Sequence, residues 1–264
     1  TIVKERPELT VNNLKPGRPY AVYMQSICDA DNVESGSSLW TDAYDITTLC
    51  PDVYSLPYSD DFDDYSLGTQ HKSVQSLFPS CIDVAASKIA DEKKVCVYTG
   101  TSSKLPHSSS DHTQAKEYGS SLYFYPSKGG WLKAKLPKVD MRVDSLMITF
   151  YVTTTSNFAD LHVGISYQEE FTPIKTIAVK QYEWQKVVIP FDAYKGTTLI
   201  EVDENGKMDT TVVWGDRITF YGNPTDNAPI MYIDDLTIDV ITGCHAPSSF
   251  KADSVSHNSI TYKW

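Results

Sequence analysis

Two acidic stretches of the sequence have residue types that could do chemistry together. The first reads LPYSDDFDDY at residues 56–65, and the second reads MYIDDLTI at residues 231–238. Crowded carboxylates repel one another unless a cation neutralises them, and Ca²⁺ accepts six to eight oxygen ligands with flexible geometry. If the fold brings the stretches together, they predict a calcium site that fastens the first strand of a domain to its last. The alternative is that these are solvated carboxylates which prevent edge-strand pairing.

Other residues give little support for catalysis. The sequence contains no G-x-S-x-G, no HExxH and no glycine-rich phosphate loop, and neither Cys81 nor Cys96 lies in a thiol-protease signature. His107 and His112 fall in a polar stretch, residues 100–118, where we expect a surface loop with solvated side chains rather than a metal site. We therefore expect that the chain is not an enzyme.

Composition narrows the classes of partner. The chain has 264 residues, a net charge of −11 and a hydrophobic fraction of 41%, which is enough for a packed core. An acidic surface repels phosphate backbones, so we expect no nucleic-acid partner. No apolar run reaches the length of a membrane span, so we expect no direct membrane insertion.

The five cysteines are Cys28, Cys50, Cys81, Cys96 and Cys244. None forms a CxxC pair or a zinc-spaced cluster with histidine, which argues against structural zinc. Their wide spacing in a tyrosine-rich chain favours an oxidising compartment with at least one disulfide. We expect Cys50–Cys81 first and Cys81–Cys96 second, with buried free thiols as the alternative.

The elements that must position these residues are strands. No stretch shows a sustained helical periodicity, so we expect helices to be short or absent. Many antiparallel strands in one medium-sized segment predict an all-β fold, a two-sheet antiparallel jelly-roll sandwich. The predicted strands are 120–126, 129–137, 145–154, 160–167, 174–180, 184–191, 216–222 and 229–241.

The sequence patterns at both ends of the chain resemble parts of other β-sandwiches. An L-x-P-G-x-x-Y turn at residues 14–20 has the spacing of a tyrosine corner, and alternating strands follow at 20–28 and 40–48. This region resembles the last strands of a fibronectin type III domain, and residues 245–264 resemble the first strands of another. An edge hairpin of the next domain is the alternative for the first region.

These resemblances divide the chain into three segments. We expect the C-terminal part of a fibronectin type III domain at 1–49, the jelly roll at 50–242 and the first strands of a following fibronectin type III domain at 243–264. In such an arrangement Cys28 and Cys244 would pair with cysteines beyond the two ends of the sequence.

Further motifs of the middle segment recur in one family. They are Asp61-Phe62-Asp63, Tyr232-Ile233-Asp234-Asp235, a strand start at Gly119–Leu122 and a Trp-x-x-Val strand at Trp184–Val187. In this order they resemble the cleaved-adhesin jelly-roll modules of Bacteroidetes surface and secreted proteins. These modules are MAM-like, of the choice-of-anchor J type, and alternate with fibronectin type III repeats.

The resemblance implies the ligands of the calcium ion. Asp63 and Asp234 are the matching positions, and Asp61 and Asp235 follow them less closely, because neighbours on a strand point to opposite faces. Many relatives have Glu at the position of Asp63, which reaches further. The implied cofactor is a structural Ca²⁺.

Aromatic residues offer candidates for stacking on sugar rings. Trp184 and Trp214 flank strongly apolar strands, so we expect both in the core, and we expect Trp40 and Trp264 in the cores of the flanking sandwiches. No residue can be assigned to a ligand-binding site from the sequence. The candidates are Trp131, Trp184, Trp214, Tyr123, Tyr125, Tyr182, Tyr221 and Tyr232.

The sequence therefore predicts a non-catalytic binding or adhesion module of a large extracellular or cell-surface protein. Its expected partners are a glycan or an extracellular protein ligand, together with neighbouring domains of the same polypeptide. The alternatives are a structural spacer and an accessory carbohydrate-binding module of a secreted hydrolase.

Overall fold

The structure is a computed structural model, and it describes most of the central segment and parts of both ends. The described residues are 9–28, 36–65, 81–88, 94–99, 105–106, 111–113, 119–202, 208–223, 229–242, 251–255 and 260–263.

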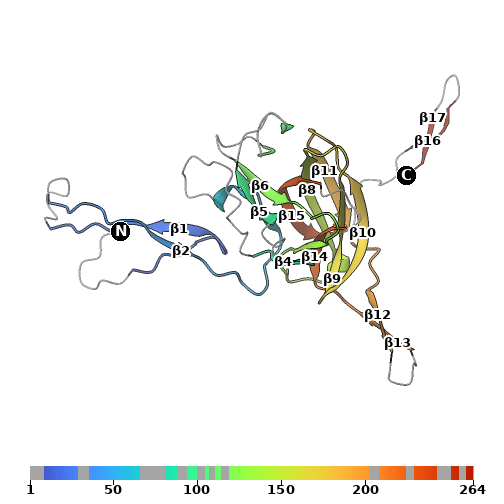
Figure 1. The fold of residues 1–264 in the computed structure, drawn as a ribbon, viewed down its shortest axis with the longest axis horizontal. Helices are drawn as coiled ribbons and strands as arrows, with labels where there is room; N and C mark the ends of the chain where they lie inside the picture. Colours follow the sequence, from blue (N-terminus) through green and yellow to red (C-terminus); the bar gives the residue numbers. More distant parts are fainter. Residues whose placement is uncertain are drawn as a thin grey trace.

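Two antiparallel sheets pack face to face and form the body of the molecule (Figure 1). The five-stranded sheet has the order β10 (Glu170–Ala178), β9 (Asp160–Tyr167), β14 (Arg217–Gly222), β7 (Leu132–Lys135) and β4 (Asp83–Ala86). The six-stranded sheet has the order β11 (Gln185–Pro190), β8 (Leu146–Thr154), β15 (Met231–Val240), β6 (Ser120–Phe124) and β5 (Val95–Thr99), with β3 (Tyr58–Asp60) also paired to β15. The chain is therefore an all-β, antiparallel jelly-roll sandwich, as predicted.

Each of the eight predicted strands of the middle segment overlaps an observed strand, although β10 begins at Glu170, four residues before the predicted start. The helical elements with bounds in the described residues are two 3₁₀ turns, η1 (Asp63–Tyr65) and η4 (Val143–Ser145). In the described part of the chain no helix has the length and apolar character needed to cross a membrane.

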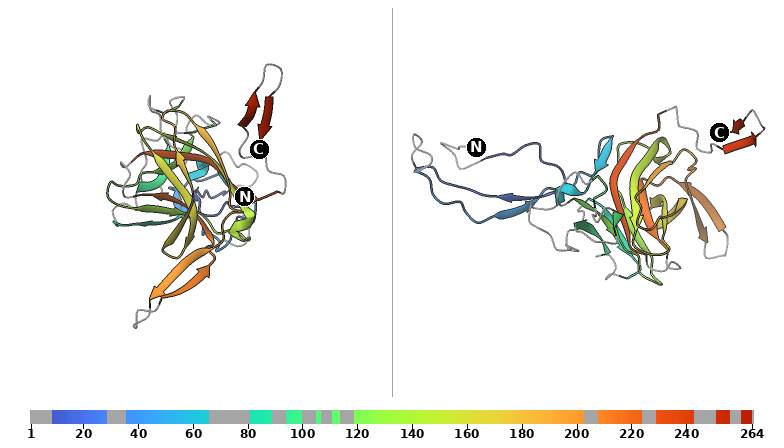
Figure 2. Two further views of the ribbon diagram at one scale, coloured as in Figure 1. Left: turned by 90° about the vertical axis from the view of Figure 1, so that its right-hand side faces the viewer. Right: turned by 90° about the horizontal axis from the view of Figure 1, so that it is seen from above.

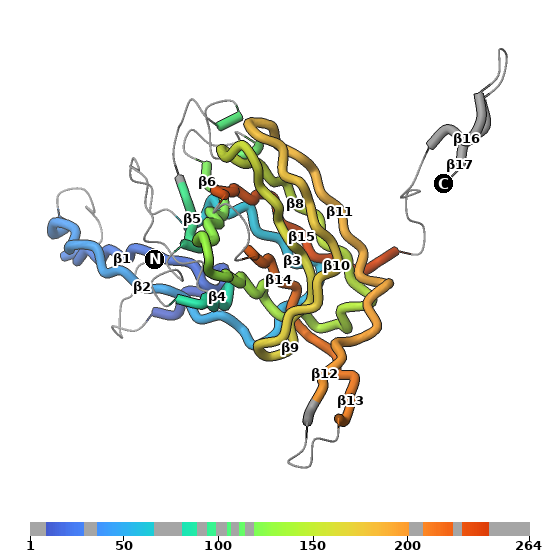
Figure 3. The backbone as a smooth tube through the Cα atoms, turned by 45° about the vertical axis from the view of Figure 1, so that its right-hand side comes forward, coloured from blue at the N-terminus to red at the C-terminus, as the bar shows by residue number. Residues whose placement is uncertain are grey.

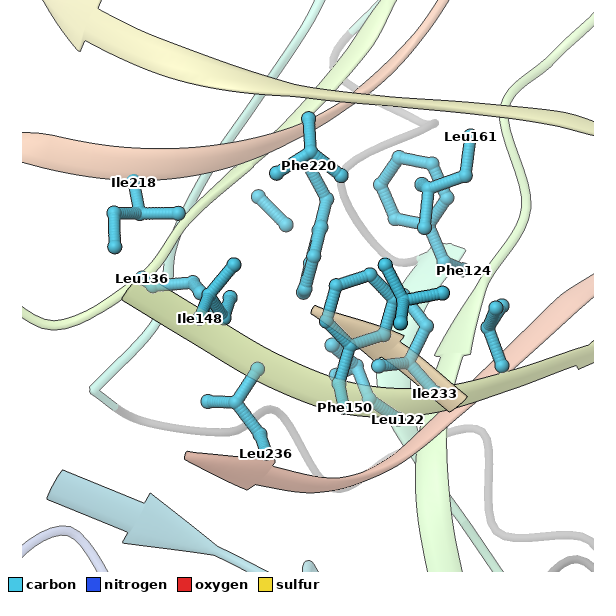
Figure 4. Packing of buried hydrophobic residues seen from close by; sticks show 14 of the residues in the cluster. Leu122, Phe124, Leu136, Ile148, Phe150, Leu161, Ile218, Phe220, Ile233 and Leu236 are labelled. Atoms are coloured by element: carbon cyan, nitrogen blue, oxygen red, sulfur yellow. The ribbon is translucent and has the colours of Figure 1, made fainter. Parts of the chain in front are cut away.

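The core lies between the two sheets and follows the alternation of the strands. On β8 the side chains of Leu146, Ile148, Phe150 and Val152 are fully buried, while the residues between them are only partly buried. The rings of Phe150 and Phe220 meet across the sandwich, with centroids 5.1 Å apart (Figure 4). Aromatic and β-branched residues therefore join the two inner faces.

The first strand of the sandwich pairs with its last, as the calcium prediction required. β3 runs antiparallel to β15, with Asp60 opposite Leu236 and Tyr58 opposite Ile238. The register of β15 against β8 shifts between Asp234 and Thr237. A bulge of this kind breaks the strict alternation of side chains at this point.

Three two-stranded hairpins extend from the body: β1 (Pro19–Val22) with β2 (Tyr44–Thr47), β12 (Thr197–Val202) with β13 (Met208–Val213), and β16 (Lys251–Val255) with β17 (Ile260–Lys263). The β1–β2 and β16–β17 hairpins lie on different sides of the sandwich (Figure 2), and β12–β13 projects as a separate arm (Figure 3).

The predicted tyrosine corner is present in the β1–β2 hairpin. The Tyr20 hydroxyl accepts a hydrogen bond from the Lys15 backbone N–H at 2.8 Å. The strands are shorter than the predicted 20–28 and 40–48. Trp40 is 63% exposed, so the prediction that it lies in a core was wrong, and Trp264 lies outside the described residues. The hairpin itself provides only one layer, which cannot bury an indole on both faces.

The preferred disulfide is confirmed. Cys50 and Cys81 are bonded, with their Cα atoms 5.5 Å apart. The Cys81–Cys96 alternative is therefore wrong: Cys96 is a buried free thiol on β5, and Cys28 is an exposed free thiol. Cys244 lies outside the described residues.

Candidate functional site

Two of the four predicted calcium ligands are buried beside the sandwich core. Asp63 begins η1 and is 7% exposed, and its Oδ1 accepts a hydrogen bond from the Ser120 N–H at 2.7 Å. Asp234, on β15, is 1% exposed and accepts hydrogen bonds from the N–H groups of His112 and Asp235. Asp63 therefore contacts the start of β6, and Asp234 contacts the segment that carries His112.

The other two predicted ligands lie elsewhere. Asp61 is exposed, and together with Asp235 it lines a groove of about 470 Å³ beside β3 and β15. Asp235 has a positive φ of 48° at the bulge, and its Oδ2 lies 2.6 Å from Nδ1 of His112. Asp234 and Asp235 therefore both contact His112, Asp234 through the backbone N–H and Asp235 through the ring.

A further buried carboxylate was not predicted. Asp111 is 1% exposed and lies so close to Gly119 that a Cβ there would be 1.9 Å from Asp111 Oδ2. Burial raises the pKa of Asp234 to about 9, the hydrogen bond from His112 opposes this, and the charges of Asp235 and Asp111 add to it. Asp111 stands in an aperiodic stretch, where no pattern in the sequence could have indicated it.

The described residues offer the kind of ligand that Ca²⁺ prefers, but too few side chains to fill its coordination shell. Asp63, Asp111 and Asp234 offer buried carboxylate oxygens, which Ca²⁺ prefers. In this part of the chain no group of three or more His, Cys, Asp or Glu side chains is arranged closely enough to hold a metal ion. Backbone oxygens would therefore have to complete the coordination.

His112 does not behave as a solvated loop histidine. Its ring stacks on Tyr151 with centroids 3.5 Å apart and meets Trp184 edge-on at 5.6 Å. The expectation for His112 was therefore wrong, because the segment that carries it packs on the outer face of the six-stranded sheet. His107 lies outside the described residues.

Several of the aromatic candidates are engaged on that same outer face. Tyr98, Tyr123 and Tyr232 pack ring against ring, with centroids between 5.4 and 6.0 Å apart. Tyr123 and Tyr232 are 8% and 7% exposed, and burial raises the pKa of Tyr232 to about 12. Trp184 and Tyr125 pack against this cluster and are partly buried, and Lys94 Nζ lies 4.8 Å from the Tyr125 ring. These rings offer little free surface to a ligand.

The outer face of the five-stranded sheet is also filled by its own side chains. Lys133 is 6% exposed, lies 4.8 Å above the Trp131 ring and donates to the Glu169 carbonyl. The ring of Phe171 stacks on Tyr221 with centroids 4.6 Å apart. Tyr182 is 46% exposed, but it lies in neither of the two grooves described here.

An open groove with an exposed indole lies at one end of the sandwich. It has a volume of about 400 Å³, and Trp214 on its wall is 41% exposed, so the prediction that this residue is core was wrong. Trp214 follows the last residue of β13 by one position, where the chain has left the arm and has not yet entered β14. The groove is lined by Val53, residues 138–143 and residues 214–216.

Polar side chains in fixed positions surround the indole. The Arg142 guanidinium lies 4.3 Å from the Trp214 ring centroid and forms two hydrogen bonds with the Asp144 carboxylate, at 2.8 and 3.2 Å. Lys138 Nζ forms an ion pair with Asp216 at 2.9 Å. The groove thus combines an aromatic surface with donors and acceptors of hydrogen bonds.

The segment that carries the indole is held by buried contacts. The Tyr194 ring meets Trp214 edge-on at 5.4 Å, and its hydroxyl accepts a hydrogen bond from the Gly215 N–H at 3.0 Å. A Cβ on Gly215 would lie 2.4 Å from Ile165 Cγ2, so only glycine allows the chain to approach β9 this closely. Trp214 is therefore presented by a rigid segment.

Comparisons with known proteins find likeness in fold only. No protein-family model and no curated protein matches the chain. Among the similar solved structures is the CBM22-1 xylan-binding domain of Paenibacillus barcinonensis Xyn10C, with 15% identity, a TM-score of 0.35, and coverage of 65% of this chain and 93% of that domain. A family 11 carbohydrate-binding module from Clostridium thermocellum has 13% identity, a TM-score of 0.33, and coverage of 61% and 89%. A family 29 carbohydrate-binding module has 14% identity, a TM-score of 0.35, and coverage of 62% and 81%. Similarity at this level does not establish a shared ligand.

Proposed function

We propose that the chain is a non-catalytic binding module which recognises carbohydrate in the Trp214 groove, as part of an extracellular or cell-surface modular protein. The observation that carries this proposal is an indole that is 41% exposed on the wall of an open groove of about 400 Å³. An exposed ring on a rigid segment is an unusual placement for a tryptophan, because burial of its apolar surface is favourable.

A sugar ring has the chemistry that such a groove accepts. Its C–H face packs on an indole, while its hydroxyls both donate and accept hydrogen bonds. Lys138 and Arg142 supply donors, and Asp140 and Asp216 supply acceptors, all along the same groove. Positive and negative side chains are both present, which favours a neutral saccharide over a strongly charged one.

A glycan array with the full chain, followed by calorimetry on the best ligand, tests the proposal. Trp214→Ala should abolish binding, whereas Trp40→Ala should leave it unchanged, since Trp40 is 63% exposed on the β1–β2 hairpin and does not line the groove. Binding that survives Trp214→Ala would contradict the proposed site. The absence of any glycan or matrix-protein ligand would leave the spacer function instead.

We also propose a structural Ca²⁺ that takes carboxylate ligands from Asp63 and Asp234, with backbone oxygens completing the set. Support comes from the burial of both carboxylates and from the raised pKa of Asp234. Bound Ca²⁺ would neutralise charges that repel one another where the first and last strands of the sandwich meet. Asp61 and Asp235 are left out of this set because they line the separate groove beside β3.

The domain boundaries and the origin of the module also remain proposals. The tyrosine corner supports the assignment of residues 1–49 to a fibronectin type III domain, because it is a recurrent feature of such sandwiches. An adhesin function within a Bacteroidetes surface protein rests on the sequence motifs.

A further inference from the structure

A tight turn of the β1–β2 hairpin presents one arginine to the sandwich. Gly17 has a φ of 64°, and Arg18 follows it, immediately before β1. The Thr48 hydroxyl accepts a hydrogen bond from the Arg18 N–H at 3.0 Å and donates to the Lys15 carbonyl at 2.7 Å. Because Tyr20 also bonds to Lys15, the turn is fixed on both sides, and the direction of Arg18 is fixed with it.

The Arg18 side chain leaves the hairpin and is buried against the sandwich. Its Nη2 lies 2.8 Å from Asp60 Oδ1, and the two side chains are 9% and 1% exposed. Its guanidinium carbon lies 3.8 Å from the centroid of the Tyr65 ring. A planar guanidinium can stack and form an ion pair at the same time, which a lysine ammonium cannot.

The Asp60 carboxylate is held in position for this arginine by other hydrogen bonds. Its Oδ1 also accepts a hydrogen bond from the Phe62 N–H at 2.9 Å, and its Oδ2 accepts from the hydroxyls of Tyr58 at 3.2 Å and Tyr65 at 3.1 Å. Burial raises the pKa of both tyrosines, so each stays protonated and its hydroxyl donates a hydrogen bond to Asp60. The carboxylate is therefore held in place by residues of the sandwich alone, without Arg18.

The second strand of the hairpin is tied to the sandwich as well. Three residues after the end of β2, Cys50 is bonded to Cys81, which lies just before β4. Further on, the Tyr54 N–H donates to the Lys138 carbonyl at 2.8 Å, and the Asp140 N–H donates to the Tyr54 carbonyl at 2.9 Å. The connection between the hairpin and β3 is thus fastened at two points.

We propose that the sandwich surface around Asp60 is a docking site for the N-terminal hairpin, and that the Arg18–Asp60 pair fixes the hairpin in one orientation. The joint is rigid, and a module built on this hairpin keeps a constant direction relative to the Trp214 groove. This inference is independent of the carbohydrate proposal, since it concerns a different surface.

The burial of the pair is what distinguishes it from an ordinary surface contact. Withdrawing two charges from water is costly, and separating the pair would leave the Asp60 carboxylate buried without its cation, so the pair disfavours other orientations of the hairpin, even though Arg18 Nε has no hydrogen-bond partner among the described residues. The neighbouring Lys15–Asp64 pair is a useful contrast, because the Lys15 side chain is 62% exposed. Exposed ion pairs of this kind contribute little free energy and do little to fix an orientation.

Distances between two spin labels on the full chain test the proposal. In a background that carries Cys28→Ser and Cys244→Ser, one label is placed at Asp42→Cys on the hairpin and one at Lys186→Cys on β11, both exposed positions. A second pair, at Asp160→Cys and Lys186→Cys, lies wholly within the sandwich and reports on its integrity. Pulsed electron–electron double resonance gives the distribution of each distance.

The hairpin–sandwich distance should be narrowly distributed in the parent protein. It should widen in Arg18→Gln and in Asp60→Asn, while the distance within the sandwich stays narrow, and Lys15→Gln should change neither. A wide distribution in the parent, or a narrow one in Arg18→Gln, overturns the proposal. Widening of both distances in both variants also overturns it, because Arg18 would then stabilise the sandwich rather than orient the hairpin.

Discussion

The guanidinium of Arg142 covers part of the Trp214 ring at 4.3 Å, and Asp144 holds it there through two hydrogen bonds. The indole is thus kept in place from one side by a cation and from its edge by Tyr194. Such an arrangement reduces the freedom that a ligand would otherwise have to remove on binding. If the proposed function is right, Asp144 and Tyr194 contribute to affinity without contacting the ligand.

Asp144→Ala should weaken binding without abolishing it. Arg142 would lose its anchor, and Trp214 would lose a cation–π contact of about 0.5–1 kcal/mol, so we expect the dissociation constant to rise roughly two- to fivefold. Calorimetry with the ligand from the glycan array measures this. Glu183→Gln, which breaks the exposed Lys180–Glu183 pair away from the groove, is the control and should have no effect. An unchanged affinity in Asp144→Ala would argue against a positioning role.

Gly215→Ala should destabilise the sandwich. The added Cβ would lie 2.4 Å from Ile165 Cγ2 and 2.5 Å from the Ser166 carbonyl oxygen, so the segment must move away from β9. Overpacking of this kind costs about 1–3 kcal/mol of unfolding free energy. Urea denaturation followed by tryptophan fluorescence measures the change. A midpoint equal to that of the parent would show that the segment is free to shift.

Loss of the Cys50–Cys81 disulfide should lower the unfolding free energy by about 3 kcal/mol. The bond closes a loop with a sequence separation of 31 residues, and opening it increases the entropy of the unfolded chain. The Cys50→Ser, Cys81→Ser double variant tests this by chemical denaturation. Cys28→Ser is the matched control, since Cys28 is a free and exposed thiol. Equal stability of the double variant and the parent would contradict the expectation.

The two described free cysteines should differ in their reactivity. Burial raises the pKa of the Cys96 thiol to about 11, so its reactive thiolate is scarce at neutral pH and increases as the pH rises toward that value. Cys28 is exposed. Iodoacetamide labelling of the folded protein, read by mass spectrometry, should modify Cys28 quickly at pH 8 and Cys96 only slowly. Comparable rates at pH 8 would show that the Cys96 cluster opens readily.

Calcium should raise the melting temperature of the parent protein, and EDTA should reverse the change. Asp234→Asn removes the charge that the ion would neutralise, so its melting temperature should no longer respond to Ca²⁺. Asp61→Asn is the control and should respond as the parent does, because Asp61 is exposed and lines the groove beside β3. A parent protein that is insensitive to both Ca²⁺ and EDTA would refute the calcium proposal.

The long strands of the sandwich could be predicted because alternation over six or more residues is a strong signal. β3 was expected only as the first strand that carries an acidic motif, and β4 and β5, with four and five residues, were missed. β6 and β7 are equally short, but they lie within longer apolar stretches that could be recognised. β12 and β13 were missed for a different reason: they form a projecting arm whose described side chains are mostly exposed, so no apolar alternation marks them.

Sites were harder to predict than strands, because they depend on contacts between distant residues. The buried carboxylates Asp63 and Asp234 lie in local acidic motifs that drew attention to them, although their role as calcium ligands stays a prediction, whereas Arg18 gives no local sign of a partner 42 positions away. Trp214 was expected in the core because apolar strands flank it. Its exposure follows from its place at the exit of the arm, which periodicity does not reveal. The tyrosine corner, by contrast, lies within one turn and was predicted correctly.

The position of β15 has a consequence for how the domain is made in the cell. This strand lies between β8 and β6 and also pairs with β3, yet it is the last strand of the sandwich in the sequence. A growing chain that ends before residue 231 has β11 with β8 and β5 with β6, but nothing to join these pairs into one sheet. Such long-range pairing is slow and leaves strand edges open. The six-stranded sheet of this domain can therefore be completed only after its final strand has been synthesised.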